Sequence, residues 1–203
     1  MSNAKTKSNV MSPKFRAFYA NVWEPRAMQE GKEPFYSVMM VFDKEAQATD
    51  EFKALKREAM KAAKEKFGEK LPSNLRTPFR KGEEKLDTNG MEADFVFVNA
   101  KSKYQPGVVD QGARDIIDKD AFYSGCYARA TVMAYAYDVQ GNKGIAFGLQ
   151  NLQKLGEGEV LGGRKAAKDE FSVVEGFDSN ESDFAEDDFG SSEGESNDDD
   201  FGI

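Results

Sequence analysis

The chain has 203 residues and a formal net charge of −8, and it contains one cysteine and no histidine. Without histidine, a Ser-His or Cys-His nucleophile, an imidazole general base and the usual histidine-containing zinc sites are excluded. One cysteine excludes an intrachain disulfide, no apolar run is long enough to span a membrane, and residues 1–12 lack the apolar region of a secretory signal. These features favour a cytoplasmic protein with no membrane partner.

The charge is divided unevenly along the chain. Residues 169–203 hold 14 Asp or Glu and no Lys or Arg, so the 28 basic residues and the other 22 of the 36 acidic residues give residues 1–168 a charge of +6. We expect a flexible N-terminus over 1–13, one domain over 14–165 and a disordered acidic tail over 166–203. A basic domain indicates a polyanionic partner, and the tail can compete for the same surface.

The first two expected elements are strands. Residues 14–23 alternate between two faces, and Glu24 and Pro25 are expected to end this strand. Residues 35–42 are apolar on both faces, which is typical of a buried central strand. The first face of strand 14–23 holds Phe15, Ala17, Tyr19, Asn21 and Trp23.

A helix is expected next. From Phe52 to Phe67, apolar residues recur every three or four positions, Thr49 or Asp50 can cap the start, and Gly68 is placed to end the helix. Residues 71–82 are rich in turn formers and are expected to form an exposed loop.

The rest of the domain is expected to be mainly strands. Residues 95–104 form one strand, 105–107 turn out of it, and at most a short helix follows near Ile116 and Ile117. In strand 125–138 one face is small, with Cys126 and alanines that would let the helix approach, and the other carries tyrosines. Residues 140–144 then turn into a last strand over 145–154. Its expected inward residues are Ile145, Phe147 and Leu149.

Five short strands and one inserted helix predict a mainly β protein, a five-stranded OB-fold-like antiparallel barrel. A five-stranded half-open sandwich would show almost the same pattern, so periodicity leaves that alternative open.

The motifs of catalysis are few. No phosphate-cradling loop is present, and we expect no catalytic residue, cofactor or metal. Glu83, Glu84 and Lys85 form an E-x-K triplet that a magnesium nuclease could use. Such triplets are common by chance, so a solvated loop is favoured and the nuclease is kept as an alternative. Cys126 is expected to be a buried, inert thiol.

Aromatic residues interleaved with Lys and Arg suggest binding of single-stranded nucleic acid, which needs stacking surfaces for bases and cations along the backbone. Core packing is the favoured alternative for Phe95, Phe97, Phe147 and the phenylalanines of 35–42. The candidate nucleic-acid-binding residues are Trp23, Arg26, Phe79, Arg80, Lys81, Lys101, Lys103, Tyr104, Tyr127, Arg129, Tyr135, Tyr137 and Lys143.

The tail repeats the sequence Asp-Asp-Phe-Gly at 187–190 and 199–202. Acid-flanked phenylalanines are typical of short motifs that dock into a pocket of a partner, whereas a purely solubilising tail has no use for them. A further alternative is an interaction protein whose tail mimics DNA. The candidate docking residues are Phe189, Asp198, Asp199, Asp200 and Phe201.

Five blocks, at 35–42, 78–82, 104–110, 125–129 and 144–153, occur in an order that resembles bacteriophage single-stranded DNA-binding proteins. The likeness is to the OB-fold phage family with an acidic C-terminal tail that was first catalogued as a domain of unknown function. It implies a protein of the host cytoplasm that coats single-stranded DNA during replication and recombination. It also implies recruitment of a polymerase, helicase or recombinase through the tail. The oligomeric state, a homodimer included, and the preference for DNA over RNA stay open.

Overall fold

A computed structural model describes residues 9–27 and 29–161. Most of the expected flexible N-terminus and all of the expected disordered tail lie outside these residues, as do the candidate docking residues of the tail.

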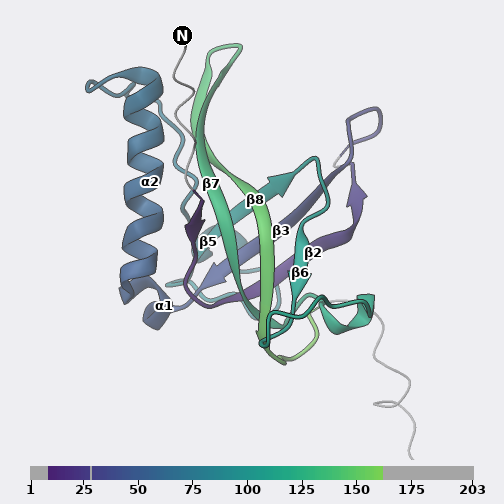
Figure 1. The fold of residues 1–203 in the computed structure, drawn as a ribbon. Helices are drawn as coiled ribbons and strands as arrows, with labels where there is room; N and C mark the ends of the chain where they lie inside the picture. Colours follow the sequence, from purple (N-terminus) through teal and green to yellow (C-terminus); the bar gives the residue numbers. More distant parts are fainter. Residues whose placement is uncertain (1–8, 28, 162–203) are drawn as a thin grey trace, which may run out of the picture. The chain divides into compact units, whose positions relative to one another are not determined.

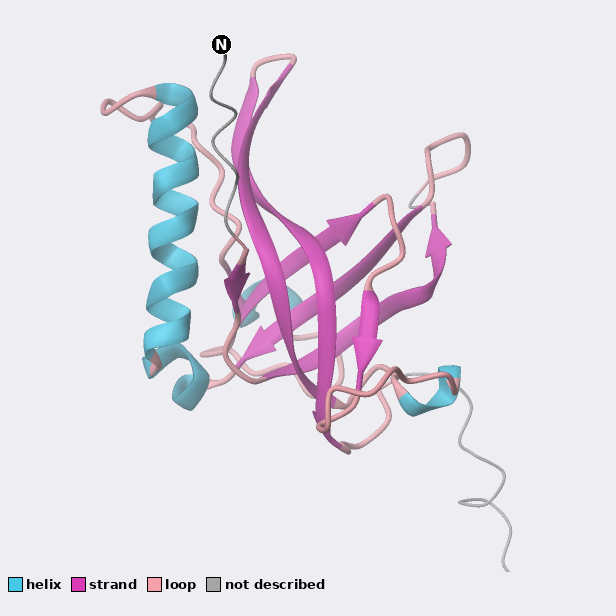
Figure 2. Ribbon diagram, viewed as in Figure 1, coloured by secondary structure: helices cyan, strands magenta, loops and turns pink. Residues whose placement is uncertain are grey.

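Strands are the main secondary structure of the described chain, and one long helix lies beside them (Figure 2). The strands are β1 (Val10–Met11), β2 (Phe15–Arg26), β3 (Phe35–Phe42), β4 (Arg80–Lys81), β5 (Val96–Ser102), β6 (Gly107–Val109), β7 (Tyr127–Val139) and β8 (Asn142–Gly156). The helices are α1 (Lys44–Ala48) and α2 (Asp50–Phe67), with 3-10 turns η1 (Gly82–Lys85) and η2 (Lys119–Ala121).

The strands form one mixed sheet in which the long β7–β8 hairpin crosses in front of β5, β3 and β2 (Figure 1). The pairing runs from β7 to β2, β3, β5 and β8, and β8 pairs again with β7. The expectation of an entirely antiparallel sheet was wrong, because β5–β8 and β6–β8 are parallel. The antiparallel pairings from β7 through β2 and β3 to β5 make β7 run opposite to β5. The hairpin reverses the chain again between β7 and β8, so β8 runs in the same direction as β5. The expected count also omitted the short strands β1, β4 and β6.

A bulge in β2 changes which residues face the core. Tyr19 has φ of 46°, and the register with β3 shifts between Phe18 and Asn21. The strict alternation predicted for this strand therefore breaks, so that Tyr19 is exposed while Val22 joins Phe15 in the core. The strand also continues to Arg26, past the Glu24 and Pro25 that were expected to end it.

Five phenylalanine rings in edge contact connect β2, β3, α2, the segment before β4, and β8. Each such contact contributes about 0.5–1.5 kcal/mol beyond the burial of area. The rings are those of Phe15, Phe42, Phe52, Phe79 and Phe147, with neighbouring centroids 5.2–5.9 Å apart.

Helix α2 begins and ends where the sequence predicts. Thr49 Oγ1 accepts a hydrogen bond from the Phe52 amide at 3.2 Å, and Gly68 closes the helix with φ of 82°. The helix packs against β7, whose buried face carries Ala128 and Ala130, and the buried Cys126 directly precedes this strand, as predicted. In the part of the chain that the structure describes, no helix is long and apolar enough to cross a membrane.

Three local expectations change. The hairpin turn is only Gln140 and Gly141, both with positive φ, which suits the right-handed twist of the flanking strands, so Gly144 already lies in β8. The expected loop 71–82 contains β4, and the short helix expected near 116–117 is a 3-10 turn at 119–121.

We predict that Ala130→Leu lowers the free energy of unfolding by about 1–3 kcal/mol, because Ala130 lies in the core on the small face of β7 and has no room for three more carbons. Chemical denaturation measures the change. Arg129→Leu on the exposed face of the same strand is the control and should shift stability by less than about 0.5 kcal/mol. Equal stability of Ala130→Leu and the wild type would contradict the packing described.

Candidate nucleic-acid interface

The outer face of β2, β3 and β5 carries a hollow of about 580 Å³. Its charged lining residues are all cations, although Arg80 also pairs with a neighbouring carboxylate. Exposed or half-buried rings of Tyr19 and Phe35 border it. Such a surface attracts an anionic chain and offers aromatic faces to it. The four cations are Arg26, Arg80, Lys85 and Lys101.

Strand pairing places polar groups in a row across this hollow. Asn21 lies opposite Ser37, and Ser37 lies opposite Lys101. Asn21 Nδ2 donates to Ser37 Oγ at 3.4 Å. Asn99, opposite Met39, adds another amide to the lining. Amide and hydroxyl groups can donate to and accept from a base edge without requiring one particular base.

A smaller hollow of about 240 Å³ adjoins the first, since Phe35 and Lys101 line both. It adds Lys103 and Tyr135, two of the residues predicted from the sequence. Lys101 Nζ lies 4.4 Å from the ring centroid of Phe35, so the cation and the ring form a common wall. Tyr104, in the turn after Lys103, is 83% exposed.

Small residues on β8 let two tyrosines of β7 lie across it. Tyr137 is paired with Gly144, where an added Cβ would lie 2.4 Å from the tyrosine hydroxyl oxygen. Tyr135 is paired with Ala146, and one of its ring carbons is 3.9 Å from the place of a Cβ on Gly148. Burial raises the pKa of the Tyr135 hydroxyl. Both tyrosines are partly exposed, so part of each ring is accessible.

Two cations of this region are held by exposed carboxylates. The hydrogen bond and the charge of Lys103 lower the pKa of Glu33, and the same contact raises the pKa of Lys103. Arg80 Nε donates to Glu84 at 3.0 Å, and this bond lowers the pKa of Glu84. Exposed ion pairs are weak, so a phosphate can replace either carboxylate.

Several predicted residues lie elsewhere. Trp23 packs against the core and donates from Nε1 to the Phe122 carbonyl at 3.2 Å, and Phe79 packs between Phe52 and Phe147. Both rings therefore have core partners. The others are Lys81 on β4, Tyr127 beside Lys14, Arg129 bonded to Gln153, and Lys143 between Asp138 and the Phe67 ring.

The sequence analysis missed the lining residues Phe35, Ser37 and Met39 because it interpreted strand 35–42 as buried on both faces. The available signal was a polar residue on an otherwise apolar strand, as at Ser37 and Asn99. The assignment of Phe35 to the core was wrong, whereas Phe42, Phe97 and Phe147 are buried as predicted. The missed residues are Tyr19, Asn21, Phe35, Ser37, Met39, Lys85 and Asn99.

The remaining candidates for chemistry are occupied or buried. Glu84 of the E-x-K triplet accepts hydrogen bonds from Arg80 and from the Lys81 amide. Cys126 is fully buried, and burial raises the pKa of its thiol. Within residues 9–27 and 29–161, no three His, Cys, Asp or Glu side chains group as metal ligands would.

Comparison with known proteins identifies a family for the chain. Residues 8–200 match the family described as Enterobacter phage Enc34, ssDNA-binding protein. The chain is 36% identical over 78 residues to putative protein p50 of Acyrthosiphon pisum secondary endosymbiont phage 1. That stretch covers 37% of this chain and 42% of p50, so the chain matches less than half of that relative.

Two solved structures are similar. The single-stranded DNA-binding protein from bacteriophage Enc34, in complex with ssDNA, gives a TM-score of 0.65 at 16% identity over 78% of this chain and 96% of that one. The single-stranded DNA-binding protein gp2.5 of bacteriophage T7 gives 0.56 at 14% identity over 85% and 98%. At these identities the likeness establishes a shared fold.

We predict that Gly144→Ala displaces the Tyr137 ring, because the new methyl group would overlap it. Nuclear Overhauser contacts between the Tyr137 ring and residue 144 should be lost. Gly148→Ala is the matched control, since its methyl group would meet only ordinary contacts of 3.7–3.9 Å. An unmoved Tyr137 ring in Gly144→Ala would contradict the arrangement.

Proposed function

Since the chain belongs to the Enterobacter phage Enc34 ssDNA-binding protein family, we propose that it binds single-stranded DNA with little sequence preference along the outer face of β2, β3 and β5 and onto β7 at Tyr135. The observation that carries this proposal is the hollow of about 580 Å³ whose charged lining residues are all cations and whose borders are aromatic. The family is described by DNA binding and not by an enzymatic activity.

The strand of DNA follows the two adjoining hollows. Its phosphates contact the cations of the larger hollow and then Lys103, while bases stack on Phe35 and on Tyr135 beside it. Each stacked base contributes about 1–3 kcal/mol. Asn21, Ser37 and Asn99 make adaptable hydrogen bonds to bases, which is compatible with many sequences. Tyr137 and the exposed Tyr104 extend the stacking surface beyond the smaller hollow.

The ring of pairing through β2, β3, β5, β8 and β7 is, in this proposal, the barrel of an OB-type domain over residues 14–165. Domains of this type bind single strands on the outer face of their central strands. The position of the hollow on β2, β3 and β5 supports this assignment.

The acidic tail competes with DNA for the hollow. The last described residue, Leu161, packs against a cluster that includes Phe18 and Met39 on the outer face of β2 and β3. Met39 also lines the hollow, so the chain leaves its described part at the DNA-binding face. Residues 169–203 hold 14 acidic side chains and no Lys or Arg, so they are attracted to the same cations that would bind the phosphates of DNA.

When DNA displaces the tail, the tail becomes free to recruit proteins of phage replication or recombination. Phe189 and Phe201 provide the apolar anchors, and Asp198, Asp199 and Asp200 provide the charge. The repeat of Asp-Asp-Phe-Gly supports recognition by a partner, because charge alone would not require a regularly placed ring.

We predict that Phe35→Leu weakens binding of oligo-dT by about 1–3 kcal/mol through the loss of one stacked base. Tyr36→Leu is the matched control, since Tyr36 is the next aromatic residue of β3 and its side chain lies on the opposite face of the strand. A fluorescence titration measures both affinities, and circular dichroism confirms folding. Equal losses in the two variants would sink the assignment of Phe35 to the DNA surface.

We predict that removal of residues 169–203 raises the affinity for oligo-dT at low salt, with a difference that shrinks as salt screens the tail. The control is full-length Phe189→Ala/Phe201→Ala, which keeps all 14 acids and should bind DNA as the wild type does. Unchanged affinity after truncation would contradict competition between the tail and DNA. Stronger DNA binding by the control would show that the phenylalanine rings, and not the charge, occupy the hollow.

A further inference from the structure

Tyr19 reaches the border of the cationic hollow because β2 carries a bulge. Between the paired positions of Phe18 and Asn21, β2 has two residues where β3 has one. Phe18 lies on the outer face, so in a regular strand the next side chain would point to the opposite face, toward the core. The extra residue turns Tyr19 outward instead, where it is 52% exposed and lines the hollow.

The backbone conformation at Tyr19 is unfavourable for this residue type. Its φ of 46° lies in the left-handed region, which glycine and asparagine adopt more readily than residues with bulky side chains. Asn21 Nδ2 donates to the Tyr19 carbonyl at 3.1 Å. The Ala20 amide donates to Ser124 Oγ at 3.0 Å. Side chains therefore hold the strained bulge in place, and strain of this kind is typical of residues that take part in binding.

The ring of Tyr19 is also held at its far end. Its hydroxyl oxygen lies 3.2 Å from Thr88 Oγ1, in the loop between η1 and β5. The Thr88 amide donates to the Lys85 carbonyl at 2.9 Å, and Lys85 lines the same hollow. The ring and this cation therefore belong to one wall, which offers a stacking surface for a base beside a charge for a phosphate.

Tyr19 and Phe35 lie toward opposite ends of the hollow. Phe18, the neighbour of Tyr19, is paired with Met39, whereas Phe35 lies four residues earlier on β3. Four residues of a strand span about 13 Å. Ser37 and the polar row through it lie between the two ends. The two rings are therefore too far apart to stack on the same base, and each can hold a base of its own.

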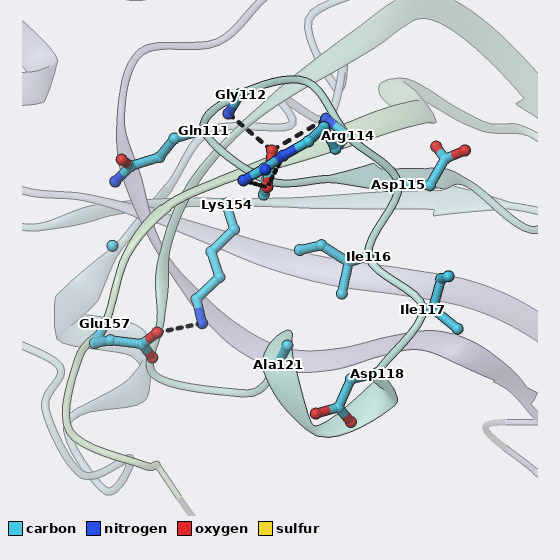
Figure 3. A pocket seen from close by; sticks show the side chains of 12 residues that line it. Gln111, Gly112, Arg114, Asp115, Ile116, Ile117, Asp118, Ala121, Lys154 and Glu157 are labelled. Carbon is cyan, nitrogen blue, oxygen red and sulfur yellow. Dashed lines mark hydrogen bonds and ion pairs between the residues drawn. The ribbon is translucent and has the colours of Figure 1, made fainter.

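A second hollow, of about 790 Å³, lacks this combination (Figure 3). The loop 110–118, the turn η2 and the last residues of β8 enclose it, and none of its lining residues in the described chain is aromatic. Its cations are paired with carboxylates, Lys154 with Glu157 at 2.6 Å and Arg114 with Asp110 at 2.7 Å. Of the two hollows, the one that Tyr19 borders is therefore the one suited to unpaired bases.

We propose that Tyr19 stacks on a DNA base at the end of the hollow opposite Phe35, and that the strained bulge of β2 serves to present its ring there. The proposal rests on the proposed binding of single-stranded DNA, and it adds a second stacked base within the larger hollow. Because stacking on a ring requires an unpaired base, Tyr19 also contributes to the preference for single over double strands.

The test compares Tyr19→Asn with Tyr19→Ala in the full-length protein, because both remove the ring while asparagine adopts positive φ more readily. Both should weaken binding of oligo-dT at least about fivefold and change binding of double-stranded DNA by less than about twofold. In chemical denaturation, Tyr19→Asn should unfold at a higher midpoint than Tyr19→Ala. Gln140→Asn, at another positive φ of 50° in the hairpin turn, is the control and should bind DNA as the wild type does.

Tyr19→Phe keeps the ring and should bind oligo-dT within about threefold of the wild type. A loss as large as that of Tyr19→Asn would overturn the stacking, because the hydroxyl would then carry the effect. The fold losses of Tyr19→Asn and Phe35→Leu should multiply in the double variant, since the two rings hold different bases. A double variant no weaker than either single variant would contradict two separate bases.

A midpoint of Tyr19→Asn equal to or below that of Tyr19→Ala would contradict the strain at the bulge. Wild-type binding of oligo-dT by folded Tyr19→Asn would overturn this inference and leave the proposed function standing. Wild-type protein that fails to bind oligo-dT would instead contradict the proposed function itself.

Discussion

The simultaneous pairing of β8 with β5 and β7 is the constraint on which the rest of the molecule depends. Gly148 is paired with Lys101 on one side and with Met133 on the other, and Phe147 lies between Ala100 and Ala134. This pairing joins the hairpin to the sheet and buries Phe147 in the core. It also brings Tyr135, far away in sequence, to the hollow that Lys101 and Phe35 share.

The outer face of the central strands has two halves with different roles. Met91 and Leu161 cover Phe18 and Val41 in a second apolar cluster, while the half near Phe35 is left open. The covered half holds Leu161, the last described residue before the acidic tail. The open half forms the cationic hollow. In the proposed function, one strand layer therefore positions both the DNA and its intramolecular competitor.

The sequence predicted the elements whose signals are local. The caps of α2, the apolar strand β3 and the small face of β7 follow from neighbouring residues, and all are found. The bulge at Tyr19 and the parallel β5–β8 pairing depend on strands distant in sequence, so periodicity could not show them. For the same reason, only some of the predicted DNA-binding residues lie on one surface. Lys101, Lys103 and Tyr135 lie together, whereas Phe79 packs in the core between rings that only the folded chain brings together.

The central claim is that the outer face of β2, β3 and β5 binds single-stranded DNA, and nuclear magnetic resonance of the ¹⁵N-labelled full-length protein tests it most directly. On addition of oligo-dT, the account predicts the largest amide shift changes at Asn21, Ser37 and Lys101, with decreasing changes through Lys103 and along β7. Largest changes on α2 or in loop 110–118, with β3 and β5 unaffected, would contradict it.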